Sequence, residues 1–409
     1  MYQNKNNEYE KSLLKVQNLS FWQGVSIIAG VCIGSGILSL AYGSRYAGFP
    51  VLVFWIIVAG LFTTISMLYV AEATLRTRNS LQLSGLTIKY LGNFGSWIMF
   101  VALFVDALSA LTAYTIGSGD VIHSLLGIPK IFGSLIFLIP ALIVVWLGLK
   151  ATGIAENTIV AAMALMILVL VLTTLLGPGV KSGYLTFHNF RFSIPVFHLA
   201  IFSFIAQYTV PQLSRGFAQG DVKRLPRAII TGMSLVAVML IIVPMSALGL
   251  SGPENIAEVA TISWAHALGR WAFFIANLFT LCAFMTSFWV YGESMLTNIV
   301  ERFHFPSEWD IKYRMISILI VAIPPIVIAY AGLIGFVDVL SVAGGIAGCM
   351  LGVLPVLILN RARKYGDHEP DWTCGWIAHP IIQSLVVIIF IGAFLYKILE
   401  IFNLLPKGW

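Results

Sequence analysis

The sequence predicts an all-α integral membrane protein with eleven transmembrane helices, arranged as a 5+5 inverted repeat plus one extra helix. The first observation is composition: of 409 residues, 59% are hydrophobic and only 10% are charged, and the mean hydropathy is +0.91. Soluble domains carry about 25% charged residues. The second is a series of apolar runs long enough to cross about 30 Å of hydrocarbon. The third is that two of these runs are interrupted at matching positions, which indicates two related halves.

The apolar runs follow one another along the chain with short polar segments between them. They lie near residues 21–45, 50–73, 93–117, 130–150, 155–177, 194–217, 228–250, 269–295, 311–331, 336–360 and 378–404. We expect residues 1–20 to form a cytoplasmic N-terminal segment, residues 21–177 the first repeat, residues 194–360 the second repeat and residues 378–404 the eleventh helix.

The distribution of basic residues predicts the orientation of the chain. With the N-terminus inside, the cytoplasmic segments hold most of the 24 Lys and Arg residues, including Arg76, Arg215 and Arg363. Such an excess on the inner side is typical of multi-pass proteins. The formal charge of +6 therefore reflects topology and not a nucleic-acid surface. We expect a multi-pass protein of the cell membrane (inner or plasma membrane), embedded in lipid, with a cytoplasmic N-terminus and no nucleic-acid partner.

The first run is interrupted at its midpoint by Gly30–Gly36, which reads Gly-Val-Cys-Ile-Gly-Ser-Gly. Each glycine in a helix interior costs about 1 kcal/mol relative to alanine. A helix in lipid can open only where its freed N–H and C=O groups face protein, water or a ligand. The segment therefore predicts an unwound helix whose open backbone is a binding site. The alternative is a face of small residues for helix packing.

The sixth run is interrupted as well, within residues 202–212. Pro211 removes a backbone donor and clashes with the preceding turn, and Gln207 is costly in lipid. When the offset from Gly34 to Gln207 is applied to the second and third runs, they fall on the seventh and eighth. Because each half holds five spans, an odd number, the second half must insert upside down. Two inverted halves that each open on a broken helix are typical of secondary transporters.

Several motifs carry a resemblance to known transporters. The Gly30–Gly36 segment resembles the broken first helix of the amino acid–polyamine–organocation superfamily, which has the leucine-transporter fold. More narrowly, residues 203–213 resemble the sixth helix of the amino acid/auxin permease and hydroxy/aromatic amino acid permease families, with Gln207 where aromatic-type permeases often have His. Residues 113–120 and 283–288 are similar to their third and eighth helices. The likeness covers most of residues 21–360 in order.

An amino acid needs opposite partners for its carboxylate and its ammonium group. The free N–H groups at the start of the second half-helix would attract the carboxylate, and carbonyls freed around residues 204–207 would receive the ammonium. The resemblance implies that Tyr114 caps the substrate, although an interfacial tyrosine is the alternative; Phe288 is a further candidate wall. The predicted substrate-binding residues are Ile33, Gly34, Ser35, Gly36, Tyr114, Phe204, Ile205, Ala206, Gln207 and Tyr208.

Two features are candidates for ion coupling. The resemblance implies a sodium site between the first and eighth helices, with carbonyls of Gly30, Ile33 and Ala283 and the hydroxyls of Thr286 and Ser287. The alternative is that both hydroxyls bond back to their own helix. Asp106 is the deepest acid of the chain, and a carboxylate at membrane depth should face the interior or a water path. It is a candidate proton acceptor, a partner of a cationic substrate, or a structural partner of a loop base.

The sequence thus predicts a symporter of neutral, aromatic or hydroxylated L-amino acids, driven by a sodium or proton gradient, with no other cofactor. Alternatives are a carrier of another solute on the same fold, such as a cationic amino acid or a metal ion, and a channel. An intramembrane enzyme would need His/Glu clusters or paired acids within a span, and the sequence has neither, so the chain is predicted not to be an enzyme. The oligomeric state is not indicated.

Overall fold

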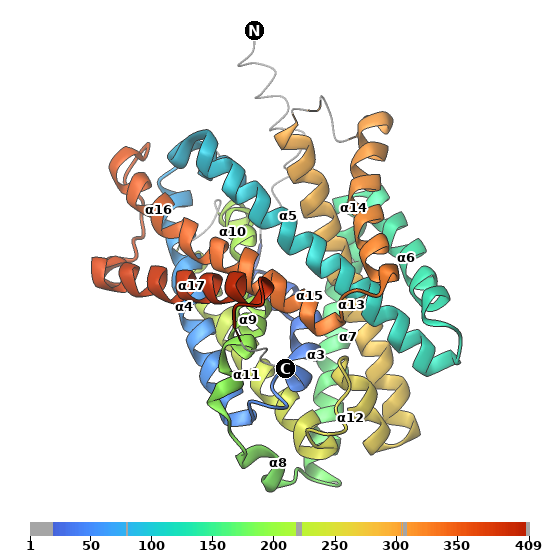
Figure 1. Ribbon diagram of the computed structural model, residues 1–409. Coiled ribbons are helices and arrows are strands. Elements are labelled where there is room, and N and C mark those ends of the chain that lie inside the picture. The colour runs from blue at the N-terminus through green and yellow to red at the C-terminus, as the bar shows by residue number, and fades with distance from the viewer. Residues whose placement is uncertain (1–18, 79–80, 218–222, 304, 306–308, 406–409) are drawn as a thin grey trace.

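The computed structural model describes residues 19–78, 81–217, 223–303, 305 and 309–405, with the backbone alone described for residues 149–161 and 301. Every regular element in these ranges is helical (Figure 1). The helices are α2 (Phe21–Cys32), α3 (Ser35–Gly43), α4 (Phe49–Leu75), α5 (Leu83–Leu126), α6 (Lys130–Leu147), α7 (Leu149–Leu176), α8 (Ser182–Thr186), η1 (Phe190–Phe192), α9 (Ser193–Ser203), η2 (Gln207–Thr209), α10 (Val210–Phe217), α11 (Arg224–Ser251), α12 (Ala260–Leu268), α13 (Arg270–Arg302), α14 (Ile311–Ala331), α15 (Phe336–Val342), the π-helical turn η3 (Ala343–Gly348), α16 (Cys349–Tyr365), η4 (Gly375–Ala378) and α17 (Pro380–Ile401). The predicted N-terminal segment 1–20 lies outside the described residues except for its last two.

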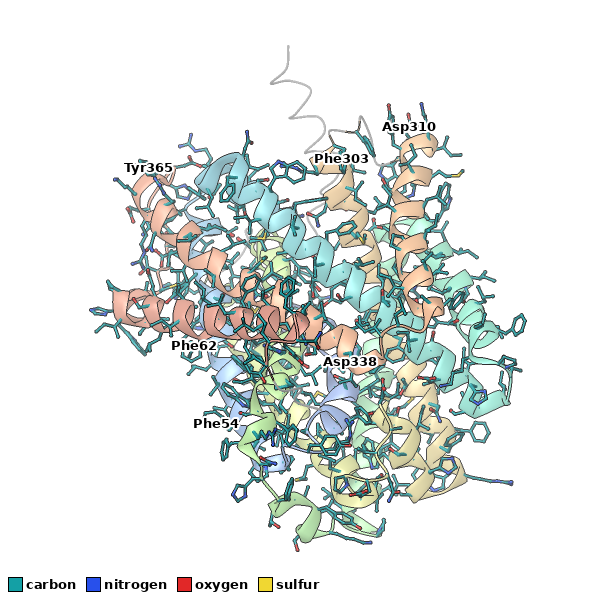
Figure 2. The ribbon with its side chains drawn as sticks, in the orientation of Figure 1. Phe54, Phe62, Phe303, Asp310, Asp338 and Tyr365 are labelled. Carbon is teal, nitrogen blue, oxygen red and sulfur yellow. The ribbon has the colours of Figure 1, made fainter. Side chains whose placement is uncertain are left out.

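Most of these helices are apolar and long enough to cross a membrane. The described residues contain nine such helices, and the bent pair α2–α3 makes a tenth if it is one span. In α7, the part whose side chains are described, Ala162–Leu176, is a shorter apolar helix. Large apolar side chains such as Phe54 of α4, which is 49% exposed, project from the perimeter (Figure 2), as lipid-facing residues do. The all-α membrane class is confirmed, while the count of eleven spans stays a prediction.

Helix α5 runs obliquely across the molecule and packs against α13, α6, α14 and α16 (Figure 1). It is much longer than the apolar run at 93–117 from which it was predicted, because it continues a first segment that precedes a sharp bend at Gly92 (φ 70°, ψ −167°). That first segment contains Thr87, Lys89 and Tyr90, so hydropathy alone does not mark it as part of a span. Its position brings Asp106 and Tyr114 to the centre of the bundle, where both are at most 1% exposed.

The loops gather at two opposite faces. On one face the N–H of Asp367 donates to the Arg76 carbonyl at 2.9 Å, and Lys89 forms an ion pair with Asp367. Figure 2 shows Phe303, Asp310 and Tyr365 at this same end of the molecule. We call it the basic face, because Lys and Arg residues of the helix ends and connections gather there, among them Arg76, Arg78, Lys89, Arg224, Arg227, Arg302, Lys312, Arg361, Arg363 and Lys364.

The opposite face is built from the other set of connections. The N–H of Asn189 donates to the Ala47 carbonyl at 2.7 Å, and the N–H of Lys181 donates to the Gly249 carbonyl at 2.8 Å. Helices α8 and α12 cover this face (Figure 1). The predicted eleventh helix corresponds to α17, which packs against α16, η3 and α9.

Candidate functional site

The first opened helix is the pair α2–α3. α2 ends at Cys32, where the N–H of Ile33 donates to the Ala29 carbonyl at 2.8 Å, and α3 begins at Ser35 after a bend of 47°. The first N–H groups of a helix have no acceptor within that helix, and no described side chain caps the start of α3. Ser35 Oγ is buried and has no hydrogen-bond partner within the geometric limits among the described residues. The opening therefore exposes backbone donors and a hydroxyl to the interior of the bundle.

Glycine is required at this opening because neighbouring helices approach its backbone closely. A Cβ atom added at Gly34 would lie 2.5 Å from Ser287 Oγ of α13 and 3.3 Å from the hydroxyl oxygen of Tyr114 on α5. A Cβ atom added at Gly36 would lie 2.4 Å from Ser203 Oγ and 2.9 Å from its Cα atom, which is backbone and cannot move aside. The two glycines therefore bring three helices, α5, α9 and α13, against one short segment.

The second opened helix is formed by α9, η2 and α10. α9 ends at Ser203, and Phe204–Ala206 are not helical. Gln207 Oε1 accepts from the N–H of Ala206 at 3.1 Å, and Thr209 Oγ1 donates to the Ala206 carbonyl at 2.7 Å. The Phe204 and Ile205 carbonyls accept no backbone hydrogen bond within the described chain. The Gln207 side chain thus stabilises the opened turn, and two backbone acceptors beside it stay free.

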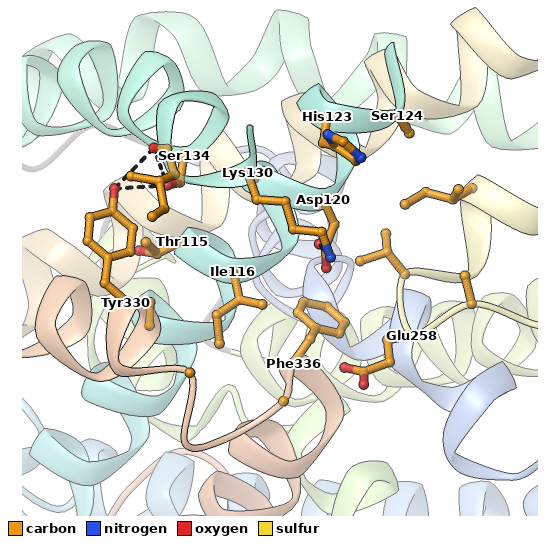
Figure 3. Close-up of a pocket in the computed structure, with 18 of the residues that line it drawn as sticks. Thr115, Ile116, Asp120, His123, Ser124, Lys130, Ser134, Glu258, Tyr330 and Phe336 are labelled. Carbon is orange, nitrogen blue, oxygen red and sulfur yellow. Dashed lines mark hydrogen bonds and ion pairs between the residues drawn. The ribbon is translucent and has the colours of Figure 1, made fainter. Parts of the chain in front are cut away.

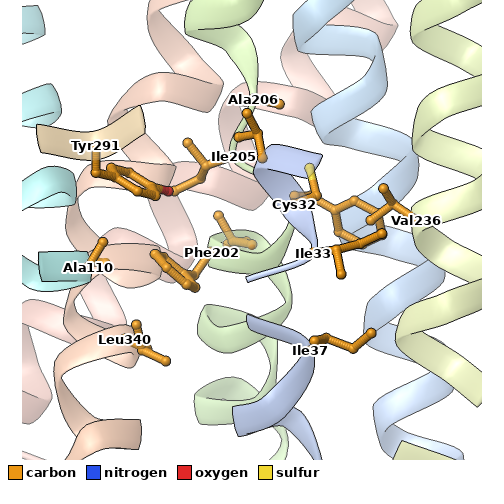
Figure 4. Packing of buried hydrophobic residues seen from close by; sticks show 14 of the residues in the cluster. Cys32, Ile33, Ile37, Ala110, Phe202, Ile205, Ala206, Val236, Tyr291 and Leu340 are labelled. Carbon is orange, nitrogen blue, oxygen red and sulfur yellow. The ribbon is translucent and has the colours of Figure 1, made fainter. Parts of the chain in front are cut away.

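Tyrosines from three elements surround these openings; Tyr114 and Tyr291 are buried and Tyr208 is partly buried. The rings of Tyr114 (α5) and Tyr208 (η2) each lie next to that of Tyr291 (α13), with centroid distances of 6.2 and 6.1 Å. The Tyr114 hydroxyl lies near the hydroxyls of Ser35 and Ser287. Figure 4 shows the Tyr291 ring pointing toward Ile205 of the second opening, while Cys32 and Ile33 of the first lie close by. We call Tyr114, Tyr208 and Tyr291 the tyrosine cluster.

Tyr291 is a site residue that the sequence analysis did not identify. It lies four residues after Ser287 and eight after Ala283, so all three share one face of α13. The i, i+4 spacing from the candidate ion ligands was therefore the signal that could have found it. Tyr208 and Tyr114 were both predicted, and the structure brings them to the same place.

Asp106 lies below the tyrosine cluster on α5, eight residues and about two turns before Tyr114. It is 1% exposed, and its Oδ1 atom has no hydrogen-bond partner among the described residues. All three tyrosines of the cluster lie close enough to Asp106 for its charge to interact with their hydroxyl groups. A carboxyl group in such surroundings binds a proton or a cation in preference to remaining a bare charge.

The predicted sodium ligands are divided between two environments. Thr286 Oγ1 donates within its own helix, and the Cys282 and Ala283 carbonyls both lie 3.1 Å from it. The hydroxyl hydrogen of Thr286 therefore bonds back to the helix, as the alternative interpretation expects. A hydroxyl that donates in this way keeps lone pairs for a cation. Ser287 Oγ has no partner among the described residues and faces Gly34. Gly30, in the last turn of α2, and Ile33, which follows that helix, are both buried. This donor set, all oxygen, suits a hard monovalent cation.

Two predicted wall residues pack away from the tyrosine cluster. The Phe204 ring lies against Gly60 of α4, where an added Cβ would be 2.9 Å from the ring. The Phe288 ring packs edge-on against Phe137 of α6 with a centroid distance of 5.9 Å. At the Phe204 position, the backbone carbonyl rather than the ring is therefore the group available to a ligand.

A pocket of about 580 Å³ opens on the face opposite the basic face (Figure 3). It lies between the ends of α5, α6, α14 and α15, and Lys130 Nζ lies 2.6 Å from Asp120 Oδ1 within it. Glu258 also lines it, and burial raises the pKa of this carboxyl group. Phe336 at its base contacts Phe284, which in turn contacts Tyr114, with centroid distances of 5.8 and 5.5 Å. A continuous row of rings therefore connects the pocket to the central site.

Two opened helices that meet at a buried polar centre, with a vestibule on one face, define a secondary transporter and not an enzyme. Comparison with known proteins agrees with this class. The model of the tryptophan/tyrosine permease family matches residues 17–398, and the chain belongs to that family. It is a secondary amino acid transporter with the leucine-transporter fold.

Two transport proteins of Haemophilus influenzae are similar to the chain over most of its length. The tyrosine-specific transport system 1 of Haemophilus influenzae is 24% identical over 365 residues, which cover 84% of this chain and 88% of the relative. The tryptophan-specific transport protein of the same organism is 24% identical over 383 residues, which cover 86% and 90%. The crystal structure of MhsT in complex with L-phenylalanine matches with a TM-score of 0.66 and 14% identity, covering 93% of this chain and 100% of that one. This last likeness shows the fold.

Proposed function

We propose that this protein carries aromatic L-amino acids, of the tyrosine and tryptophan class, into the cell together with a cation. The observation that carries the proposal is the tyrosine cluster between the two opened helices, because buried aromatic rings favour an aromatic side chain by stacking. The two relatives, one named tyrosine-specific and the other tryptophan-specific, support the same substrate class.

The groups around the cluster match the zwitterion. The N–H groups of Ser35 and Gly36 begin α3, whose positive dipole end attracts the substrate carboxylate. The unused carbonyls of Phe204 and Ile205 accept from the ammonium group. Rocking of the opened helices against α5 and α13 then exposes this site to each side in turn.

The coupling ion is proposed from the same surroundings. Ser287, Thr286 and the nearby carbonyls of Gly30, Ile33 and Ala283 would hold sodium, which would add positive charge beside the substrate carboxylate. A proton on Asp106 is the second candidate, supported by its unpartnered Oδ1 atom at the foot of the tyrosine cluster. The excess of Lys and Arg on the basic face supports a cytoplasmic location for that face, and hence for the N-terminus, in the cell membrane.

The test is uptake into proteoliposomes of labelled tyrosine and tryptophan, with a competition panel of all twenty amino acids and with sodium and pH gradients applied separately. We expect saturable uptake, counterflow, and competition by aromatic amino acids above all others. If sodium is the coupling ion, Ser287→Ala should weaken the stimulation of uptake by sodium. If the proton is the coupling ion, Asp106→Asn should instead abolish pH-driven accumulation and spare exchange. Uptake that is inert to every aromatic amino acid, or that does not saturate, would contradict the proposal.

A further inference from the structure

Two polar atoms of the central site are left unused when the zwitterion is bound at the two openings. Asp106 is 1% exposed, and its Oδ1 atom has no hydrogen-bond partner among the described residues. The hydroxyl oxygen of Tyr208 is shielded from solvent and likewise has no partner in the described chain. Buried polar groups are almost always hydrogen-bonded, and an exception calls for an explanation in function or in a bound species. The two atoms therefore indicate a bound group that completes their hydrogen bonds.

The position of Asp106 on α5 separates it from the groups that would bind the zwitterion. The Tyr114 hydroxyl lies near Ser35 Oγ at the start of α3. Asp106 precedes Tyr114 by eight residues, about 12 Å along α5, which is comparable with the length of an extended tyrosine. Its charge still reaches the hydroxyl groups of Tyr208 and Tyr291. Asp106 is therefore placed to meet the far end of a substrate whose carboxylate binds at α3.

Between these two positions, α5 presents a small apolar side chain. Ala110 lies four residues after Asp106 and four before Tyr114, so the three residues share one face of the helix. Ala110 is fully buried, and Figure 4 shows it in the same packed region as Tyr291 and Phe202. This face of α5 thus has an apolar step between two polar ends. An aromatic amino acid whose ring carries a polar group has the same order of apolar and polar parts.

The chemistry of the two atoms defines the group that they would bind. An ionised carboxylate only accepts hydrogen bonds, and a protonated one keeps an acceptor oxygen, whereas a tyrosine hydroxyl both donates and accepts. The bound group must therefore offer a hydrogen atom to Asp106, as the phenol O–H of tyrosine and the indole N–H of tryptophan do. The ring of phenylalanine offers none. The substrate ammonium group is an alternative donor, but it shares a carbon atom with the carboxylate, and the free carbonyls of Phe204 and Ile205 accept from it.

We propose that Asp106 and the Tyr208 hydroxyl form the polar end of the binding site for the substrate ring and select rings that carry a hydrogen-bond donor. The Asp106 carboxyl group accepts the phenol or indole hydrogen, and the Tyr208 hydroxyl donates to the phenol oxygen. Phenylalanine leaves the carboxyl group buried and unpaired, and a site built for a donor strongly rejects a ligand that lacks it. The inference rests on the proposed function. It holds for either coupling ion, because a carboxyl group that has bound a proton still accepts.

Equilibrium binding tests this selection without reference to transport. With labelled tyrosine and labelled phenylalanine on the detergent-purified full chain, at saturating sodium and one pH, we expect the wild type to bind tyrosine at least about tenfold more tightly. Asp106→Leu removes the acceptor and keeps the approximate shape of the side chain, so the two Kd values should agree within about twofold, through weaker binding of tyrosine. Asp106→Asn keeps a neutral acceptor oxygen and should retain a preference for tyrosine of at least about threefold. Glu254→Gln, at an exposed acid, is the control and should keep the wild-type ratio.

A tryptophan analogue and a second variant give independent arms. In β-(3-benzothienyl)alanine, sulfur replaces the indole N–H while the shape of tryptophan is kept, so the wild type should bind it at least about tenfold more weakly than tryptophan. Asp106→Leu should bind the two with Kd values within about twofold of each other. Tyr208→Phe removes a single oxygen atom and protects the test against a folding defect at Asp106. It should lower the preference for tyrosine over phenylalanine about threefold and leave the binding of phenylalanine unchanged.

The ratio of the two affinities distinguishes selection from a structural role. A structural role of Asp106 would weaken tyrosine and phenylalanine alike, so an unchanged ratio in Asp106→Leu and in Tyr208→Phe would overturn the inference. Equal binding of tyrosine and phenylalanine by the wild type would also overturn it, and would leave the proposed function standing. Failure of the wild type to bind any aromatic amino acid would overturn the proposed function and the inference with it.

Discussion

At the scale of single residues, the site depends on the absence of side chains as much as on their presence. Gly36 lies against the backbone of Ser203, so the two opened helices touch where they would bind the substrate. The same holds for Gly34 against Ser287 and Tyr114. The glycines of the first break were identified from the sequence because they are poor helix formers. Their close approach to α9 and α13 could not be, since it depends on how distant segments pack.

Replacing Gly36 by alanine should therefore block transport. The added Cβ would lie 2.9 Å from the Ser203 Cα atom and would force α3 and α9 apart, at an overpacking cost of about 1–3 kcal/mol. We expect the variant to reach the membrane and to lose at least about tenfold in initial uptake rate. Gly392→Ala, where no atom lies within 4 Å of the added Cβ, is the control and should transport normally. Normal uptake by Gly36→Ala would mean that this contact is not part of the transport cycle.

Tyr291 gives a second test at this scale. Tyr291→Phe keeps the ring and removes the hydroxyl, so it should cost the net value of about one hydrogen bond, or roughly a three- to tenfold rise in the apparent KM for tyrosine. Tyr291→Ala, which also removes the stacking surface, should be much more severe. Tyr46→Phe, at a half-exposed ring on the outer face, is the matched control. An unchanged KM in both Tyr291 variants would exclude this ring from the substrate site.

At the scale of elements, one buried carboxylate joins three segments of the chain at the basic face. Glu72 of α4 is fully buried and accepts from Arg363 of α16 twice at 2.8 Å, from Arg76 at 3.0 Å and from the Cys374 N–H at 2.7 Å. The carboxylate thus joins α4, α16 and the segment before α17. Glu72 lies near the end of an apolar run, and its four hydrogen bonds indicate a structural junction.

Glu72→Gln should destabilise the whole protein. The variant keeps the shape of the side chain but leaves two guanidinium groups without their buried counter-charge, which typically costs about 3–5 kcal/mol. We expect a clear fall in the melting temperature of the purified protein. Glu369, the other partner of Arg76, has a side chain that is 84% exposed. Glu369→Gln should therefore change the stability by less than about 1 kcal/mol. Equal melting temperatures for the two variants would contradict this assignment.

The elements also show how far the sequence could be interpreted. Both helix breaks and the oblique third helix were predicted in nearly correct positions, because glycine, proline and hydropathy act locally. The start of α5 at Leu83 was missed, since its first turns carry polar residues before the bend at Gly92. The burial of charge on α17 could not be predicted either: Lys397 and Glu400 lie in the last apolar run, and only the fold shows that their side chains are 6% and 12% exposed.

At the scale of the whole molecule, the two faces differ in what closes them. The basic face is held by ion pairs among α4, α5 and α16, including Lys89 with Asp367, whose pKa is lowered by that contact. The opposite face has a pocket of about 580 Å³ and a row of rings that leads from Phe336 to the tyrosine cluster. A pocket of about 480 Å³, lined by Leu91, Leu357, Asn360, Arg361 and Lys364, also lies at the basic face, so what distinguishes the opposite face is the row of rings that leads from its pocket to the tyrosine cluster. For the central site to open toward the basic face, the ion pairs of that face must separate.

Glu258 of the outer pocket should make the stability of the protein depend on pH. Its Oε2 atom accepts from the N–H of Val337 at 3.4 Å, so it joins the segment before α12 to the start of α15. Burial raises the pKa of this carboxyl group, and the charge of Asp338 raises it further. A raised folded-state pKa means that the folded protein binds the proton more tightly than the unfolded chain. The stability that the proton on Glu258 contributes is therefore complete below the ordinary glutamate pKa. It is lost as the pH rises through the raised pKa of the folded protein.

The melting temperature of the purified wild type should accordingly fall as the pH rises from about 4.3, the ordinary glutamate value, toward neutrality. Glu258→Gln, which is neutral at every pH, should lack this component and melt at or above the wild-type temperature at pH 7. The variant and the wild type should converge at the acidic end, where both side chains are uncharged. Glu254→Gln, exposed on the same segment, should follow the wild-type curve. A Glu258→Gln curve parallel to the wild type across the whole range would show that the Val337 hydrogen bond offsets burial, so that the folded and unfolded proteins bind this proton equally tightly.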